Sequence, residues 1–408
     1  MRPRYKNLKS YETLTEVTTI KDVVDYLRNF VQMPSFSGKE RELALSIRDI
    51  LGEFGLDRVH IDELGDVIGF VEGKAPRPLV LLEGHMDHVS PGNLAKWKHK
   101  PYAAEVVDGK IFGRGTVDMK AALAAMAFAA KEIACKEHQG TLALCFVVHE
   151  ETVEGTAIGH IIEKELKEMP DLVVLGEATN LDLGIGHRGR AVINVELSGK
   201  TAHASMPELG LNALHTASRL ITDVVEELGP RLPFHDELGK ATITTISLDA
   251  SPKGIPQLPD KARILFDRRI VLGETESDVL KPMKEKIDAL VAGGKVLDGT
   301  ACILEEDLNC WTGRKLRVKN FFPSWLIQET DIVQRALKSL RNRGLTAKTH
   351  VWRFSTDGIY TYGLRRIPTV GLGPGEEALA HQPNEYVRVK DVKKAVQAYV
   401  ALAESFIS

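Results

Sequence analysis

The 408-residue sequence is poor in cysteine, and the few cysteines present form no dense framework. They are Cys135, Cys145, Cys302 and Cys310, with no Cys-x-x-Cys pair among them. A disulfide-stapled secreted domain needs closely spaced cysteines, so this sparse set argues against secretion. Scattered single cysteines are typical of proteins in a reducing compartment, and we therefore expect a cytoplasmic protein with unpaired thiols.

The sequence also lacks an excess of charge of one sign and any long apolar run. Lys and Arg number 53 and Asp and Glu number 56, a net charge of -3, so the basic surface of a nucleic-acid-binding protein is not expected. The longest stretch of small apolar residues, 121–130, is far shorter than the ~20 residues of a membrane span. Residues 1–20 contain no apolar segment of the kind found in signal peptides. Neither nucleic acid nor a membrane is an expected partner.

What the sequence does contain is an alternation of short apolar strands with amphipathic helices. Partly β-branched runs predict strands at 79–82, 142–148 and 172–175, and helical spacing predicts helices at 20–31, 40–54, 116–136 and 154–167. Strands that alternate with helices favour an α/β fold with a mostly parallel central sheet flanked by helices.

The pattern changes after Gly186. Alternating strands are predicted at 191–197, 241–248, 261–270 and 301–305, with helices at 211–228 and 277–292. This order is typical of a small α+β unit of the split βαβ kind. We therefore expect an inserted domain at 187–299 between two parts of the main domain, 1–186 and 300–408. The last part, with helices predicted at 331–343 and 390–406 and strands near His350 and Thr369, would return to the first sheet.

Histidines and carboxylates follow the predicted strand ends of the first sheet, where open α/β sheets place their sites. They are His85, Asp87 and His88 after the first strand, Asp118 at the start of a helix, His149, Glu150 and Glu151, then Glu177, and His381 in a late loop. Each histidine alone is more often a locally satisfied polar residue. Together the imidazoles and carboxylates form a ligand set suited to zinc or a similar divalent ion. We expect Asp87, on the same face of the strand as His85, to hydrogen-bond the second nitrogen of that imidazole or a nearby ligand.

Six segments in one order give the chain a family resemblance. They are Gly-His-Met-Asp-His-Val, Gly-Arg-Gly-Thr-Val-Asp-Met-Lys, His-Glu-Glu, Gly-Glu-Ala-Thr, Thr-Ala-His-Ala-Ser, and Gly-Pro-Gly through His-Gln-Pro-Asn-Glu. The chain resembles the zinc-dependent amidohydrolases that include aminoacylase, acetylornithine deacetylase, succinyl-diaminopimelate desuccinylase and glutamate carboxypeptidase. Arg188-Gly189-Arg190, Phe321-Phe322-Pro323-Ser324-Trp325 and Phe354-Ser355-Thr356-Asp357-Gly358 are most similar to the YgeY-type branch of peptidases.

The resemblance implies a dinuclear metal site. His85 and Glu177 would bind one zinc ion, Glu151 and His381 the other, and Asp118 would bridge the two; cobalt or manganese could replace zinc. The family also has a cis peptide bond after the bridging aspartate.

The resemblance further implies catalytic roles for three residues and a homodimer. Glu150 would be the general base for a metal-bridged water, and Asp87 would support the ligands. The inserted domain would form the dimer contact, and its His203 would reach the active site of the partner subunit.

The expected reaction is hydrolysis of an amide or peptide bond in a small N-acyl amino acid or dipeptide. Arg269, Arg188 and Arg353 are candidates for binding a substrate carboxylate, as is Arg190, because a guanidinium presents a planar fork to it. Alternatives are an aminopeptidase or dipeptidase activity, or a catalytically silent metal-binding homologue. A metal-free nucleophilic hydrolase is disfavoured because the sequence has no Gly-x-Ser-x-Gly elbow.

Overall fold

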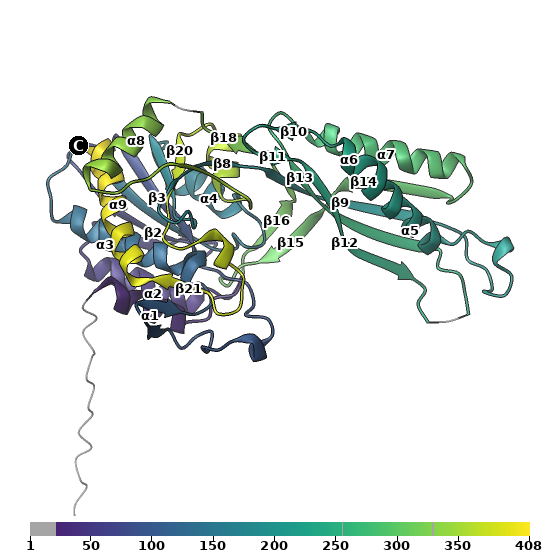
Figure 1. Ribbon diagram of the computed structural model, residues 1–408, viewed down its shortest axis with the longest axis horizontal. Coiled ribbons are helices and arrows are strands. Elements are labelled where there is room, and N and C mark those ends of the chain that lie inside the picture. Colours follow the sequence, from purple (N-terminus) through teal and green to yellow (C-terminus); the bar gives the residue numbers. More distant parts are fainter. Residues whose placement is uncertain (1–21, 255, 329) are drawn as a thin grey trace, which may run out of the picture.

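The computed structural model describes residues 22–254, 256–328 and 330–408, so the expected absence of a signal segment at 1–20 lies outside them. The chain forms an elongated molecule in which a large α/β part is followed along the long axis by a smaller part with its own sheet (Figure 1). In the described part of the chain, no helix is long and apolar enough to cross a membrane.

The larger part is built on a mixed sheet. In spatial order its strands are β1 (Arg58–Ile61), β2 (Val67–Val71), β6 (Thr141–Val147), β3 (Leu79–His85), β7 (Leu172–Leu175), β20 (Thr369–Gly371), β8 (Leu183–His187) and β18 (Trp325–Leu326), and β19 (Thr349–Trp352) also pairs with β8. The central strands β6, β3, β7 and β20 are parallel, whereas β2 and β8 run antiparallel to their central neighbours. The predicted α/β class with a parallel centre is confirmed.

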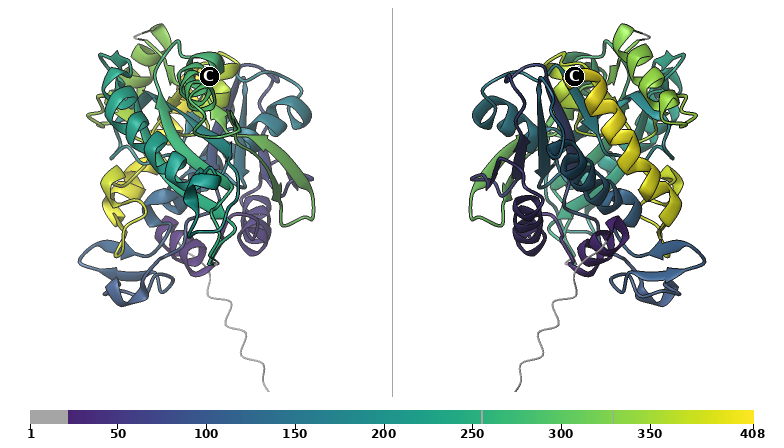
Figure 2. Two further views of the ribbon diagram at one scale, coloured as in Figure 1. Left: turned by 90° about the vertical axis from the view of Figure 1, so that its right-hand side faces the viewer. Right: turned by 90° about the vertical axis from the view of Figure 1, so that its left-hand side faces the viewer.

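Helices cover this sheet. They are α1 (Val23–Gln32), α2 (Arg41–Glu53), α3 (Ala121–Ala134), α4 (Thr156–His160), α8 (Asp331–Asn342) and α9 (Val389–Ile407). α9 packs against α1, α3 and α8, and the right-hand view of Figure 2 shows it running diagonally along the side of the molecule. Seven of the ten buried residues of α3 are alanines, and these short side chains allow α9 to approach closely.

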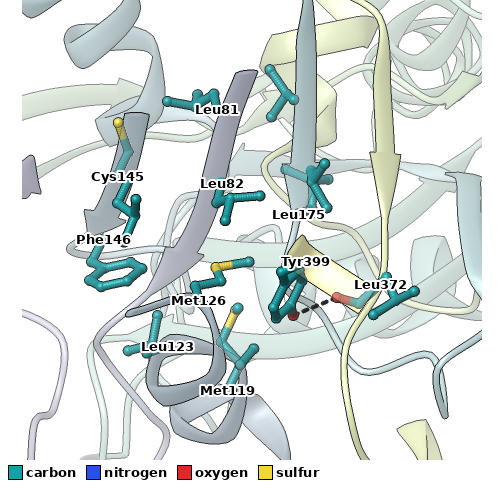
Figure 3. Packing of buried hydrophobic residues seen from close by; sticks show 14 of the residues in the cluster. Leu81, Leu82, Met119, Leu123, Met126, Cys145, Phe146, Leu175, Leu372 and Tyr399 are labelled. Carbon is teal, nitrogen blue, oxygen red and sulfur yellow. Dashed lines mark hydrogen bonds between the residues drawn. The ribbon is translucent and has the colours of Figure 1, made fainter. Parts of the chain in front are cut away.

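The hydrophobic core between the sheet and these helices extends up to the ends of the strands (Figure 3). Met119, Leu123 and Met126 lie against the strands, and the Tyr399 hydroxyl donates to the Leu372 carbonyl at 2.6 Å. A Cβ atom on Gly84 would lie 2.4 Å from the Met119 methyl and 2.9 Å from a Leu123 methyl, so a larger residue would require both side chains to move. The glycine before His85 is therefore explained by close packing.

The smaller part is an antiparallel sheet with its own hydrophobic cluster. Its strands lie in the order β12 (Thr242–Ser251), β13 (Lys261–Ile270), β9 (Gly189–Ser198) and β14 (Asp298–Ile303), with α5 (Ala213–Asp223) and α7 (Glu276–Ala292) packed on it. Leu304 still donates its backbone N–H to Val192 of β9. Because position 299 falls inside β14, we propose that the inserted domain runs from 187 to 304.

The sequence analysis missed a hairpin that joins the two parts. β15 (Glu305–Asn309) and β16 (Lys315–Lys319) form a two-stranded sheet whose turn reaches the β1–β2 connection. There Trp311 covers Gly65, where a Cβ atom would lie 2.1 Å from the indole nitrogen, and Thr312 donates to the Glu63 carbonyl at 2.7 Å. The hairpin thus fastens the segment after β14 to the larger part.

The remaining elements are short. They are β4 (Glu105–Val107), β5 (Lys110–Phe112) and β21 (Tyr386–Arg388), which form one small sheet, β10 (Phe234–His235) and β11 (Gly239–Lys240), which form another, β17 (Phe321–Phe322), which pairs with β9, and α6 (Gly229–Arg231). β21 brings the loop that contains His381 next to the segment that leads to Asp118.

Candidate metal centre and active site

The predicted ligands converge at the carboxyl ends of the central parallel strands. His85 is the last residue of β3, Glu150 and Glu151 follow β6, and Glu177 follows β7. Because parallel strands end at the same edge of a sheet, residues far apart in the sequence meet there. Asp118 joins them from the turn before α3, which contains the cis peptide bond expected between Asp118 and Met119.

His85 faces several carboxylates with one nitrogen and the backbone with the other. Its Nδ1 lies 2.9 Å from the Asp87 carbonyl oxygen, so a proton on Nδ1 is held there. Its Nε2 lies 2.8 Å from Asp118 Oδ1, 3.5 Å from Glu177 Oε1 and 3.9 Å from Glu150 Oε2. A backbone contact that fixes the tautomer and leaves Nε2 toward acidic oxygens is typical of a ligating histidine.

The second histidine uses the other oxygen of Asp118. His381 Nε2 lies 3.0 Å from Asp118 Oδ2 and 3.1 Å from Glu151 Oε2. The two oxygens of Asp118 thus face two different histidines, each with a further carboxylate beside it.

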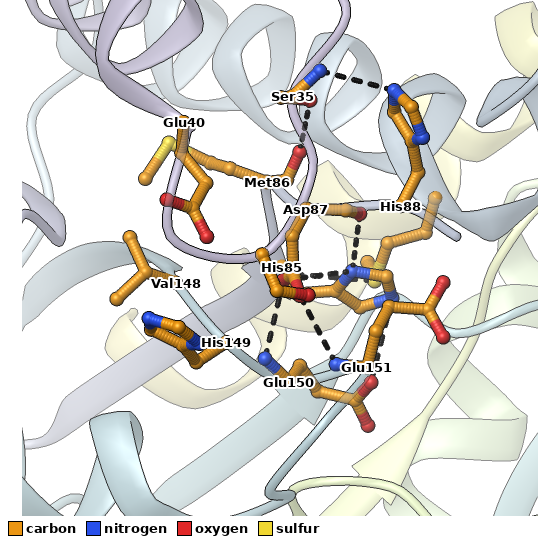
Figure 4. A network of polar contacts seen from close by, with 12 residues as sticks. Ser35, Glu40, His85, Met86, Asp87, His88, Val148, His149, Glu150 and Glu151 are labelled. Carbon is orange, nitrogen blue, oxygen red and sulfur yellow. Dashed lines mark hydrogen bonds and ion pairs between the residues drawn. The ribbon is translucent and has the colours of Figure 1, made fainter. Parts of the chain in front are cut away.

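Asp87 makes the second of the two contacts expected for it, to a neighbouring ligand candidate, and not the first, to the imidazole of His85. Its carboxylate Oδ1 is 3.6 Å from His85 Nδ1, too far for a hydrogen bond, because the Asp87 backbone carbonyl occupies that place. The carboxylate instead accepts the backbone N–H groups of Glu150 at 3.1 Å and Glu151 at 3.2 Å (Figure 4). It also accepts the Ser37 hydroxyl at 2.6 Å. Asp87 therefore positions the two glutamates rather than the imidazole.

The density of acidic groups shifts the protonation of the site. Burial raises the pKa of Glu150, and repulsion from Glu177 adds to the rise; burial and the charge of Asp118 raise the pKa of Glu177 to about 7. Hydrogen bonds to Asp118 and Glu151 raise the pKa of His381 to about 10. Burial would raise the pKa of Asp118, but hydrogen bonds from His381 and His85 hold it below its usual value. The carboxylates thus stabilise a positive charge among them, as the raised pKa of His381 shows.

This donor set fits two divalent cations. Glu150 Oε1 and Glu177 Oε2 are buried without any hydrogen-bond partner, and buried charged oxygens are normally paired or coordinate a metal. Imidazole nitrogens and carboxylate oxygens in such a mixture suit zinc and similar ions. One group of possible ligand atoms combines His85, Glu150 and Glu177, and another combines His85, Asp118 and Glu151.

A cavity of about 750 Å³ opens beside these groups and extends toward the second sheet. Of the four arginines considered from the sequence, Arg269, Arg353 and Arg190 line it. Arg188 does not line it, because its guanidinium donates to the Lys240 carbonyl at 2.7 Å instead. The structure therefore places Arg190, and not Arg188, in this cavity.

His203 lies away from this cavity in its own chain. It is exposed, and its Nδ1 accepts hydrogen bonds from Ser205, at 2.7 Å from the hydroxyl and 3.2 Å from the backbone nitrogen. Its expected role in the site of a partner subunit stays a prediction.

The sequence analysis missed the buried Arg114–Glu385 pair that supports Asp118. Glu385 Oε1 accepts the backbone N–H of Val117 at 2.7 Å and that of Asp118 at 3.3 Å, and its Oε2 pairs with Arg114 at 2.5 Å. Both residues lie within the motifs that carry the family resemblance, but their positions in the sequence do not indicate that their side chains contact each other. A second omission is Glu154, which lines the cavity three residues after Glu151.

The fold and the converging ligands define a metal-dependent hydrolase of the peptidase and amidohydrolase class. Residues 81–405 match Peptidase family M20/M25/M40, and the chain belongs to this family. The predicted family is confirmed.

Similar proteins agree with this assignment. The chain is 32% identical to "Uncharacterized protein YgeY" of Escherichia coli (strain K12), over 95% of each protein. It is 23% identical to succinyl-diaminopimelate desuccinylase of Buchnera aphidicola, over 95% of this chain and 99% of the relative. Among solved structures, the M20 family metallo-carboxypeptidase Sso-CP2 of Sulfolobus solfataricus has a TM-score of 0.71 at 18% identity, covering 94% of this chain and 99% of that one. The YXEP protein of Bacillus subtilis, described as a dinuclear metal-binding peptidase, has a TM-score of 0.67 at 16% identity, covering 93% and 96%.

Proposed function

We propose that this protein hydrolyses the amide or peptide bond of a small N-acyl amino acid or dipeptide with two bound divalent metal ions. Zinc is the proposed metal, with cobalt or manganese as substitutes. His85 and Glu177 would hold one ion, Glu151 and His381 the other, and Asp118 both. The observation that carries the proposal is the pair of Asp118 oxygens, 2.8 Å from His85 and 3.0 Å from His381.

Glu150 is the proposed general base. Two cations in this site would lower the pKa of a water between them and polarise the scissile carbonyl. Glu150 Oε1 has no hydrogen-bond partner, so it is free to accept a proton. The same oxygen would return that proton to the departing amine nitrogen. Burial raises the pKa of Glu150 above its usual range, which suits a group that takes and returns a proton near neutral pH.

Substrate orientation would come from the arginines of the cavity. Arg269 and Arg190 are register partners on β13 and β9, so both guanidinium groups approach the metal centre from the second sheet. Arg353 approaches from the larger part. A substrate α-carboxylate next to the scissile amide would bind there as a bidentate partner.

A homodimer through the inserted domain is part of the proposal. β12 is the last strand of the second sheet, and its Ile246 is 53% exposed and Leu248 38% exposed. An edge strand with exposed apolar side chains is suited to association with a second copy. In the dimer, His203 would reach the partner's active site and stabilise the oxyanion. We also propose a cytoplasmic location, which is compatible with four free cysteines.

The test is hydrolysis of a panel of N-acetyl, N-succinyl and N-formyl amino acids and dipeptides by metal-reconstituted protein, with Glu150→Gln beside it. We expect the variant to lose at least ~100-fold in turnover while two metal ions stay bound, because the proton acceptor is lost and the ligands remain. Glu137→Gln is the matched control, since the Glu137 side chain is 87% exposed and paired with Lys74.

Loss of metal in proportion to activity would mean that Glu150 is a ligand. Absence of hydrolysis across the whole panel by fully metal-loaded protein would favour the silent homologue. Turnover of dipeptides alone would favour the peptidase alternative.

A further inference from the structure

A second group of possible metal ligands lies outside the proposed active site, beside the end of β1. It consists of Asp62, His160 and Glu165, and one ligand atom from each lies within 4.8 Å of the other two. Asp62 directly follows β1, His160 is the last residue of α4, and Glu165 ends the helical segment that continues from α4. None of the three lines the cavity of the metal centre. Two elements far apart in the sequence thus bring these side chains together.

The carboxylate of Asp62 is fixed by the backbone, but one of its oxygens is left unpaired. Its Oδ1 accepts three backbone N–H groups, those of Leu64 at 2.9 Å, Gly65 at 2.8 Å and Asp66 at 2.9 Å. Its Oδ2 is buried and has no hydrogen-bond partner among the described residues, and Asp62 as a whole is 8% exposed. A buried carboxylate oxygen is normally paired or bound to a metal ion.

The unpaired oxygen of Asp62 faces an unpaired nitrogen. Asp62 Oδ2 lies 3.8 Å from His160 Nε2, and this nitrogen is also buried without a hydrogen-bond partner in the described part of the chain. At 3.8 Å the two atoms are too far apart for a hydrogen bond. Two ligand atoms of a tetrahedral zinc ion, each ~2.0–2.1 Å from the metal, lie roughly 3.3–3.4 Å apart. A zinc ion between Asp62 and His160 therefore needs only a small approach of the two side chains.

Further carboxylates surround this pair. Glu63 Oε1 lies 3.7 Å from the same nitrogen of His160. Glu165 Oε2 lies 2.9 Å from His60 Nε2, a contact that holds the third ligand candidate in place. The negative charge gathered around His160 favours a cation at this position.

A proton is the alternative to a metal ion. Burial, together with the charge of Asp62, raises the pKa of the buried Asp66 well above its usual value, which favours a proton on Asp66. Such a proton would neutralise the pair of aspartates but would leave His160 Nε2 without a partner. A divalent cation between Asp62 and His160 satisfies both atoms at once.

We propose that Asp62, His160 and Glu165 form a structural zinc site, separate from the proposed dinuclear centre. An imidazole nitrogen with two carboxylate oxygens suits zinc, whereas magnesium and calcium prefer oxygen ligands alone. The ion would fasten the β1–β2 connection to α4. Trp311 and Thr312 of the β15–β16 hairpin dock on this same connection, so the ion would also secure the joint between the two parts of the molecule.

Zinc content tests the site by difference. Chelator-treated protein is dialysed against a fixed concentration of free zinc, and the bound ions are counted by mass spectrometry. The variants are His160→Gln and Asp62→Asn, which keeps an oxygen for the three backbone N–H groups. We expect each variant to hold one zinc ion fewer per chain than wild type, whereas the control His215→Gln, which removes an exposed histidine, should hold as many as wild type. Equal zinc content in all four proteins would overturn the proposal and favour the proton on Asp66.

Crystallography of the wild-type protein locates the ion without any variant. In crystals grown with zinc, an anomalous difference map at the zinc edge should show a peak ~2.0–2.2 Å from both Asp62 Oδ2 and His160 Nε2. A map without a peak at this position would overturn the proposal, even if the dinuclear centre is filled. Neither measurement involves turnover. Failure of amide hydrolysis therefore leaves this site standing, and absence of the site leaves the proposed reaction intact.

Discussion

Acidification should destabilise this protein through His88. The imidazole is buried, and the Ser35 backbone N–H donates to its Nε2 at 3.0 Å (Figure 4). Its Nδ1 lies 2.9 Å from the Val89 carbonyl, so both nitrogens are occupied. Nε2 is thus an acceptor, and a second proton on the ring would break the Ser35 bond. Burial, with the charge of Lys120 nearby, lowers the pKa of His88 to about 3.

The sign of the effect follows from the lowered pKa. In the unfolded chain His88 has a pKa of ~6.5, so its contribution to stability is fully present above that pH and is lost as the pH falls toward the folded-state value. Between pH 7.5 and pH 5 the loss amounts to about 2 kcal/mol of unfolding free energy, because each pH unit below the unfolded pKa costs ~1.4 kcal/mol.

The assay is urea unfolding of wild type and His88→Gln across this pH range, because the difference between the two cancels the other titrating groups. We expect the stability difference between them to shrink or reverse by about 2 kcal/mol at the lower pH. Parallel stability curves for the two proteins would refute the reasoning and mean that His88 titrates normally when folded.

The remaining predictions concern the active site. Asp118→Ala should cost both metal ions, because one carboxylate lies between the two histidine sites; metal analysis that finds one ion lost and one kept would contradict a bridging role. His203→Ala should be nearly inactive alone. Mixing it with Glu150→Ala subunits should restore activity to about a quarter to a half of the sites, since a mixed dimer contains one complete site. If verified heterodimers show no recovered activity, His203 acts within its own chain or has only a structural role. Replacing the substrate α-carboxylate by an amide should lower kcat/KM by an amount equivalent to ~2 to 4 kcal/mol. An unchanged kcat/KM in Arg269→Ala would mean that another residue binds the carboxylate.

Much of the fold could be predicted because local patterns and final packing agree. The strand at 172–175 is β7 (Leu172–Leu175), and the helix predicted at 331–343 is α8 (Asp331–Asn342) within one residue. The helix predicted at 116–136 has an irregular first turn, because Asp118 and Met119 leave helical geometry where the Asp118 carboxylate contacts His85 and His381. Contacts with residues far apart in the chain, rather than helix propensity, accompany the change of backbone at that point.

The omissions have a common physical cause. The β15–β16 hairpin has charged and apolar residues in alternation, but its place is set by Trp311 on Gly65, a contact between residues far apart in the chain. The Asp87 carboxylate binds the backbone after β6, which no spacing within its own strand predicts. Strand ends indicated which residues converge, but not which atom of each makes the contact.

The position of β20 has a consequence for how the protein is made. This strand lies between β7 and β8, although it is synthesised long after both of them. A nascent chain that stops before residue 369 therefore lacks the strand that joins those two, and it also lacks His381. Because contacts of such long sequence separation form late and slowly, most of the chain must leave the ribosome before the main sheet is continuous. The second sheet, whose strands β9, β12, β13 and β14 all lie within 189–303 and which takes only the short β17 from later in the chain, has no such constraint and can assemble first.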